Sequence, residues 1–417
     1  MNSEYNRLNN KTFKFNKINV SEFSFRLLFI LFWVDITLVP FAEEIISRIP
    51  YLSIFSDYTI PFLRLILFIV AIPYIIKKIK PKDLIFFISF LCFIIFFCFK
   101  NIGYLDNLNE ALLDFLFNIF PVYFLGICYS HKINGKDIIY VSILGVIFVF
   151  LYQIYFISSG RILANDNMYM AYGVLPSVLC VTGVAVKTKK IINIFLMVLG
   201  FFLLLMLGTR GAIIVFLVFL ILAIVYDLKN KNNNKIKFVF LFASLVLVVI
   251  YVSSDIFLTH IHNLSTILNN VGIRTRIFDY LIEGEITTSR GREIIYRKAI
   301  ESINAKPLVG YGFLGDRILL NNYAHNLFLE LMIHFGVIFG FIISAFFIFF
   351  PIAAIIKIKD NDYKLFIIMI FCYVFIKLML SNTYVQEPYL FLLIGLSTNV
   401  LIERKYEEKD KKNFNTY

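Results

Sequence analysis

Three short blocks of the sequence place arginine or histidine next to glycine or asparagine. They are 208–212 with Arg210; 289–297 with Arg290, Arg292 and Arg297; and 324–336 with His325, Asn326 and Glu330. A guanidinium group stays charged at any relevant pH and binds phosphate oxygens in pairs. A histidine titrates near neutral pH, so it can accept a proton during a reaction.

Together these residue types suit the transfer of a group away from a lipid-linked diphosphate. We expect Arg210 and Arg292 to stabilise the leaving diphosphate and His325 to activate an acceptor hydroxyl. A helix that begins at the second block would add backbone N–H donors for the same anion. Supporting roles in substrate binding are expected for Arg290, Arg297, Asn326 and Glu330.

Each block also has a structural interpretation. Arg210 could be an anchor whose charge reaches the membrane surface. Arg290 and Arg297 could belong to a solvated helix face shared with nearby glutamates. Asn326 could cap the helix that follows, because asparagine is a favoured N-cap residue. Glu330, like other charged residues in apolar runs, could pair with a neighbouring helix.

No metal or cofactor is expected. His260 and His262 have no evident third ligand. The five cysteines lie in apolar runs and form no C-x-x-C motif, which is typical of buried thiols. The segment 308–312 looks like a potassium filter, but Leu308 stands in place of its threonine and follows Pro307, which disfavours a channel.

The composition indicates an integral membrane protein. Hydrophobic residues make up 59% of the 417 residues, and the mean hydropathy is +0.80. Soluble domains contain roughly 45–50% apolar residues, so the excess here must face lipid. The net charge of +12 does not indicate nucleic acid, because the basic residues lie between apolar runs, where they orient a membrane protein.

Apolar runs of suitable length predict about a dozen membrane-spanning helices. We place them at 25–42, 60–76, 83–99, 111–129, 137–157, 168–186, 191–207, 211–226, 236–254, 326–356, 364–380 and 387–402. Most Lys and Arg residues fall in segments that are inside when the N-terminus is cytoplasmic. The fold class is therefore an all-α polytopic membrane protein with both termini in the cytoplasm.

The spans divide the chain into five parts. They are a cytoplasmic N-terminus at 1–24, a bundle of about nine helices at 25–254, a large extracytoplasmic loop at 255–325, further spanning helices at 326–402 and a cytoplasmic tail at 403–417. Within the loop, Ile295, Ala299 and Ile303 share one helical face, and Pro307 ends that helix. The stretch 326–356 is long enough for a short turn of helix followed by a span.

The three blocks resemble the O-antigen polymerase (Wzy-type) and O-antigen ligase superfamily over roughly residues 195–345. Residues 209–212 read Thr-Arg-Gly-Ala where that family has Ser-Arg-Gly-Ala. A Gly-Arg pair at 291–292, an amphipathic helix and Pro-Leu-x-Gly-x-Gly at 307–312 follow in family order. The third match is His325-Asn326 before Gly336 and Gly340. Phe339 stands where ligases tend to carry Gly, Thr or Tyr, which favours a polymerase.

The resemblance implies a GT-C-like membrane glycosyltransferase of the bacterial inner membrane that needs no metal. Its substrate would be an undecaprenyl-diphosphate-linked oligosaccharide, and its candidate partners are the bilayer, a chain-length regulator and a flippase. Polymerisation of repeat units on the outer side of the membrane is the first expectation. An O-antigen ligase that moves polymer onto lipid A core is the near alternative. A lipid-linked oligosaccharide flippase is the alternative of another class, although suggestive residues at one face rather than at the midplane speak against it.

Overall fold

The structure, a computed structural model, describes the chain in several stretches. They are residues 29–30, 32–34, 69, 76, 81–98, 119–129, 131–158, 167–207, 209–230, 262–263, 265–266 and 292–403. The elements are α4 (Pro81–Cys98), α6 (Phe120–Ile127), α7 (His131–Ser158), α8 (Asn167–Thr188), α9 (Ile191–Leu207), α10 (Arg210–Asn230), α14 (Arg292–Ala305), α15 (Gly315–Leu320), α16 (Leu327–Lys357), α17 (Asn361–Leu380), η5 (Tyr384–Gln386), α18 (Pro388–Thr398) and the π-helical turn η6 (Asn399–Glu403). The described residues form helices and no strand, so the all-α class is confirmed.

Five of the described helices are long and apolar enough to cross a membrane, namely α7, α8, α10, α16 and α17. Shorter apolar helices lie within α4, in α9, and over α18 and the start of η6. The membrane class is therefore confirmed. The expected spans at 60–76 and 236–254, most of the span at 25–42 and most of the loop at 255–291 lie outside the described residues. The total of about a dozen spans stays a prediction.

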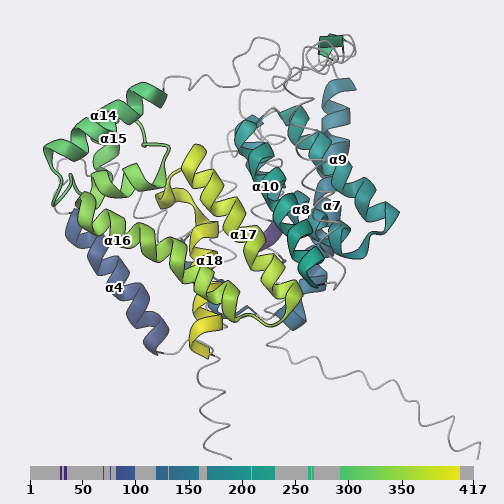
Figure 1. The fold of residues 1–417 in the computed structure, drawn as a ribbon, viewed down its shortest axis with the longest axis horizontal. Coiled ribbons are helices and arrows are strands. Elements are labelled where there is room, and N and C mark those ends of the chain that lie inside the picture. The colour runs from purple at the N-terminus through teal and green to yellow at the C-terminus, as the bar shows by residue number, and fades with distance from the viewer. Residues whose placement is uncertain are drawn as a thin grey trace, which may run out of the picture.

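The helices pack as one assembly in which α17 and α18 lie between two groups (Figure 1). One group contains α8 with α7, α9 and α10 around it, and α10 also packs on α17. The other group contains α16, which packs on α14 and α15 (Figure 1). α18 packs closely on α6, because Gly395 brings its backbone against the Tyr123 carbonyl, where an added Cβ would lie 2.2 Å from the oxygen.

The tight hairpin expected between 191–207 and 211–226 is confirmed, since α9 ends at Leu207 and α10 begins at Arg210. The expected loop helix is also confirmed as α14, which ends at Ala305, two residues before Pro307. Ala299 and Ile303 on its predicted face are buried. α7 begins at His131, six residues before the expected span at 137–157, because the polar segment 131–136 continues the helix beyond its apolar part.

A break at Gly336 divides α16 into a short first part and a longer second part. Gly336 has φ 81° and ψ 170°, which is outside the helical region and favours glycine. The break frees two carbonyl groups of the first part, and these accept hydrogen bonds from Tyr311 N (to Ile333, 2.8 Å) and Gly312 N (to His334, 2.9 Å). The break agrees with a short helix before a longer apolar part, as expected for 326–356, and which part crosses a membrane stays a prediction.

The Pro-Leu-x-Gly-x-Gly segment thus serves as a backbone clasp on α16. Val337 N donates to the Pro307 carbonyl at 2.7 Å, which completes the pairing across the break. Gly310 lies so close to α16 that an added Cβ would lie 2.6 Å from Gly336 N. The glycines of this segment permit backbone-to-backbone contact, and the segment is not arranged as a potassium filter.

Candidate functional site

Arg210 opens α10, and the residue after it packs on an aromatic side chain of α8. A Cβ added at Gly211 would lie 2.0 Å from the Tyr172 hydroxyl and 3.3 Å from Ser381 Oγ. Only a glycine allows α10 to start this close to α8 and to the end of α17. The small residue of the first block therefore places the start of α10, where Arg210 lies, against Tyr172 and Ser381.

Ser381, directly after α17, joins the first block to the third. Its Oγ lies 2.9 Å from the Tyr172 hydroxyl, and its carbonyl accepts a hydrogen bond of 3.0 Å from the Tyr323 hydroxyl. The Tyr323 ring in turn lies 4.1 Å from the ring of His325, centroid to centroid. Segments that are distant in the sequence therefore meet within a few side chains of Ser381.

His325 lies in a tight turn before α16, where its φ of 52° is a left-handed conformation that is uncommon for a non-glycine residue. Among the described residues, its buried Nδ1 has no hydrogen-bond partner. Partial burial and the positive charge of Arg292 lower the pKa of His325, and the Ser381 carbonyl and Asp316 oppose that shift. The imidazole is therefore held in the neutral form that can accept a proton.

Arg292 is the first residue of α14, and its positive charge acts on His325 and Tyr323. Its positive charge acts to lower the pKa of both His325 and Tyr323, so its guanidinium lies within electrostatic range of both side chains. Among the described residues, no carboxylate forms an ion pair with Arg292. The face of α14 that carries it also carries the buried Ala299.

The remaining predicted site residues are placed differently. Arg297 is exposed on the outward face of α14, and Arg290 lies outside the described residues. Asn326 Oδ1 accepts from Phe328 N at 3.0 Å and Leu329 N at 3.3 Å, so the N-cap interpretation of this residue is confirmed. Glu330 is completely buried, and its oxygens are taken up by neighbouring side chains.

Glu330 belongs to a buried group that we call the Asp316 network, whose members are Asp316, Arg317, Glu330, His334, Thr383 and Tyr384. Arg317 Nη1 lies 2.6 and 2.7 Å from the two Asp316 oxygens and 2.9 Å from Glu330 Oε1. Its Nη2 donates to Thr383 Oγ1 at 2.8 Å, and that hydroxyl donates to Glu330. The guanidinium thus joins both carboxylates.

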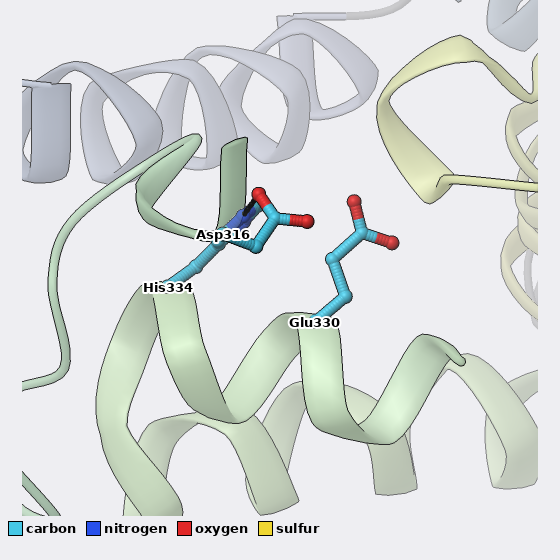
Figure 2. Close-up of side chains that lie close together, drawn as sticks. All are labelled: Asp316, Glu330 and His334. Atoms are coloured by element: carbon cyan, nitrogen blue, oxygen red, sulfur yellow. Dashed lines mark hydrogen bonds and ion pairs between the residues drawn. The ribbon is translucent and has the colours of Figure 1, made fainter. Parts of the chain in front are cut away.

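The other side of the Asp316 network contains His334. Its Nε2 lies 2.7 Å from Asp316 Oδ1, and its Nδ1 lies 2.9 Å from the Tyr384 hydroxyl. Figure 2 shows that His334 and Glu330 reach Asp316 from the same helix, α16. Burial alone would raise the pKa of Asp316, but His334 and Arg317 outweigh burial and lower it to about 2. Asp316 is therefore ionised at neutral pH.

Asp316, Glu330 and His334 have the residue types and the closeness of a metal site. Arg317, however, occupies the space between the two carboxylates and supplies the positive charge that they require. The group is therefore accounted for as an ion-pair network. Lys377 shows the same kind of pairing, because its Nζ lies 2.7 Å from Glu387 Oε2. The alternative of pairing between charged residues of apolar runs is confirmed for Glu330 and Lys377.

Sequence reasoning missed several residues of this region. They are Tyr172, Asp316, Arg317, Tyr323, Ser381 and Thr383. Asp316 and Arg317 carried one usable signal, a charged pair in a short segment between the Gly-rich clasp and an apolar helix. The others are ordinary polar residues whose partners lie far away in the sequence, so their types alone indicate nothing.

The fold and the site define a class: an all-helical membrane protein with basic, aromatic and histidine side chains gathered at one end of its helices. The model of the family described as O-antigen ligase matches residues 195–345, which include α10, α14, α15 and the first part of α16. This match supports the resemblance of residues 195–345 to the O-antigen polymerase and ligase superfamily that the motifs predicted. Searches of curated proteins and of solved structures found no match for this chain.

Proposed function

We propose that this chain is a surface-polysaccharide polymerase that joins undecaprenyl-diphosphate-linked repeat units at the outer face of the cytoplasmic membrane. One observation carries the proposal. The start of α10, which carries Arg210, packs on Tyr172 and Ser381, Tyr323 beside His325 bonds to the Ser381 carbonyl, and the charge of Arg292 acts on His325. Such a cluster offers two guanidinium groups for a diphosphate and one neutral imidazole for a hydroxyl.

In the proposed reaction, an acceptor hydroxyl of a lipid-linked repeat unit attacks the anomeric carbon of the growing chain. A new glycosidic C–O bond forms, and the bond from that carbon to the diphosphate oxygen breaks. The diphosphate leaves with the bonding electron pair, and Arg210 and Arg292 stabilise its charge. His325 takes the proton from the acceptor hydroxyl.

The ligase is the second candidate, and the description of the matching family favours it. A ligase would use the same donor and leaving group but a lipid A core as acceptor. Phe339 favours the polymerase, because ligases tend to carry Gly, Thr or Tyr at that place. The flippase alternative gains no support from the family match.

The test is a gel of surface glycolipid from a strain that lacks this gene, complemented with the wild type or with Arg210→Ala, Arg292→Ala or His325→Ala. We expect core with a single repeat unit in the uncomplemented strain and in all three variants. Lys298→Ala is the matched control, because this exposed basic residue lies on α14 away from the buried face. The control should restore long polymer.

Other outcomes separate the candidates. Bare core with long polymer on the lipid carrier would identify a ligase. Lipid-linked repeat units confined to the cytoplasmic face would identify a transporter. Wild-type chain lengths in all three site variants, with the proteins present in the membrane, would overturn the assigned roles.

A further inference from the structure

The Asp316 network lies directly behind the turn that carries His325. Asp316 is completely buried, and its Oδ2 accepts a hydrogen bond of 3.2 Å from Ala324 N, the backbone nitrogen next to His325. Ala324 is itself completely buried against Ala299 and Ile333. An ionised carboxylate therefore holds the peptide that leads into the histidine.

The Asp316 network also bonds to the segment 381–384, which follows α17. Arg317 donates to Thr383, and Tyr384 N donates to Glu330 Oε2 at 3.4 Å. These contacts fix the segment 381–384, whose first residue accepts the Tyr323 hydrogen bond and lies beside Tyr172. Both segments that face His325 are thus joined to one charged group.

The Asp316 network joins two buried carboxylates and a buried imidazole to the partly buried guanidinium of Arg317. Apolar residues of similar volume are often as stabilising as a buried ion pair, so the retained value of such a group is a fixed geometry. The members of this group restrain one another through these contacts. His334, for example, contacts Asp316 Oδ1 through Nε2 and the Tyr384 hydroxyl through Nδ1.

We propose that Asp316 and Arg317 are positioning residues that fix the orientation of His325 toward the acceptor hydroxyl. Asp316 acts through Ala324 N, and Arg317 acts through Thr383 on the 381–384 segment. The inference rests on the function proposed above, because it assumes that His325 handles a proton. It assigns neither residue a contact with substrate.

The test uses the purified full-length protein in lipid vesicles, with lipid-linked repeat units as substrate. A displacement of about 1 Å from the reactive position can cost about 100-fold in rate. We therefore expect Asp316→Asn and Arg317→Lys to lower kcat by about 10- to 100-fold with KM unchanged. Asp316→Ala, which also removes the acceptor for Ala324 N, should lose more. Asp362→Asn is the control, because this exposed carboxylate pairs with Lys187 at the other end of α17.

A pH profile separates positioning of His325 from general loss of structure. The charged groups that act on His325 are Arg292 from α14 and Asp316 and Arg317 from α15, together with the Ser381 carbonyl. Since Asp316 raises the pKa of His325, the rise of activity with pH should begin at lower pH in Asp316→Asn than in the wild type. A structural role alone would lower the rate without moving the profile.

The outcomes are distinguishable. If wild-type protein makes polymer and His325→Ala does not, while Asp316→Asn and Arg317→Lys keep the wild-type kcat and pH profile, the positioning role is wrong and the proposed function stands. If the wild type makes no polymer, the proposed function fails. If Asp316→Asn or Arg317→Lys does not accumulate in the membrane, Thr383→Val tests the contact between Arg317 and the 381–384 segment without a change of charge. An unchanged kcat in Thr383→Val would also overturn the inference.

Discussion

The Tyr172 hydroxyl lies 2.9 Å from Ser381 Oγ, and this contact joins α8 to the end of α17 directly beneath the start of α10. The tyrosine oxygen fills the space that a methyl group at position 211 would need, since such a Cβ would lie only 2.0 Å from it. The close approach of Gly211 to Tyr172 therefore sets where α10, and with it Arg210, begins.

Gly211→Ala should impair polymer formation, because the added methyl group pushes α10 and Arg210 away from Tyr172. Overpacking of this kind costs about 1–3 kcal/mol. The double variant Gly211→Ala with Tyr172→Phe removes the colliding oxygen and should recover polymer relative to Gly211→Ala alone. Chain length on a glycolipid gel is the measurement. No recovery in the double variant, at equal protein level, would show that Tyr172 does not set this spacing.

Gly336→Ala should destabilise the protein more than an alanine in an ordinary helical position. The substitution forces an L-residue to φ 81° and brings its Cβ to 2.4 Å from the Leu308 carbonyl oxygen. Strain at such a backbone conformation alone costs about 1–3 kcal/mol. Gly183→Ala is the control, because the nearest atom would be a Leu365 methyl at 3.4 Å. Thermal unfolding in detergent should show a large loss for Gly336→Ala and little change for the control.

Stability should fall in acid through Asp316. Its pKa is lowered from 3.8 to about 2 in the folded protein, so its contribution is present above about pH 4 and is lost as the pH falls toward 2. A shift of this size corresponds to roughly 2 kcal/mol. The difference in free energy of unfolding between wild type and Asp316→Asn should therefore shrink between pH 4 and pH 2. A difference that stays constant over this range would mean that the carboxylate is not stabilised by His334 and Arg317.

Lys377 and Glu387 should behave as a coupled pair. Glu387 is completely buried, so Lys377→Met leaves an uncompensated charge and should cost about 3–5 kcal/mol. The double variant Lys377→Met with Glu387→Gln should cost less than Lys377→Met alone. The exposed pair of Lys187 and Asp362 gives the comparison, because its removal should cost less than about 1 kcal/mol. Additive losses at Lys377 and Glu387 in a double-mutant cycle would contradict the pairing.

The sequence predicted the features that depend on local patterns. The spacing of Ala299 and Ile303 predicted the buried face of α14, and the four-residue connection at 208–211 predicted the hairpin of α9 and α10. It also identified Asn326 as a candidate N-cap, since that preference is a property of the residue and its immediate neighbours.

Features that depend on distant partners were not predictable. Adjacent opposite charges such as Asp316 and Arg317 are usual on solvated surfaces, and only the fold brings Glu330 and His334 against them. Ser381 became part of the candidate site because Tyr172 and Tyr323, which both lie far earlier in the chain, reach it from different elements. The periodicity and spacing of a single sequence do not predict contacts between residues that lie this far apart in the chain.

The break in α16 has a consequence for how the protein tolerates its bilayer. The part of the helix after Gly336 is about 30 Å long at 1.5 Å per residue, which matches the hydrocarbon thickness of a membrane. A thicker or thinner bilayer is accommodated by tilting the spanning part of a helix. Because the clasp at 307–312 bonds to Ile333 and His334 before the break and to Val337 after it, the angle between the two parts of α16 is held, and tilting of the spanning part would carry the first part with it. The position of His325, two residues before α16, would then respond to the lipid composition of the membrane.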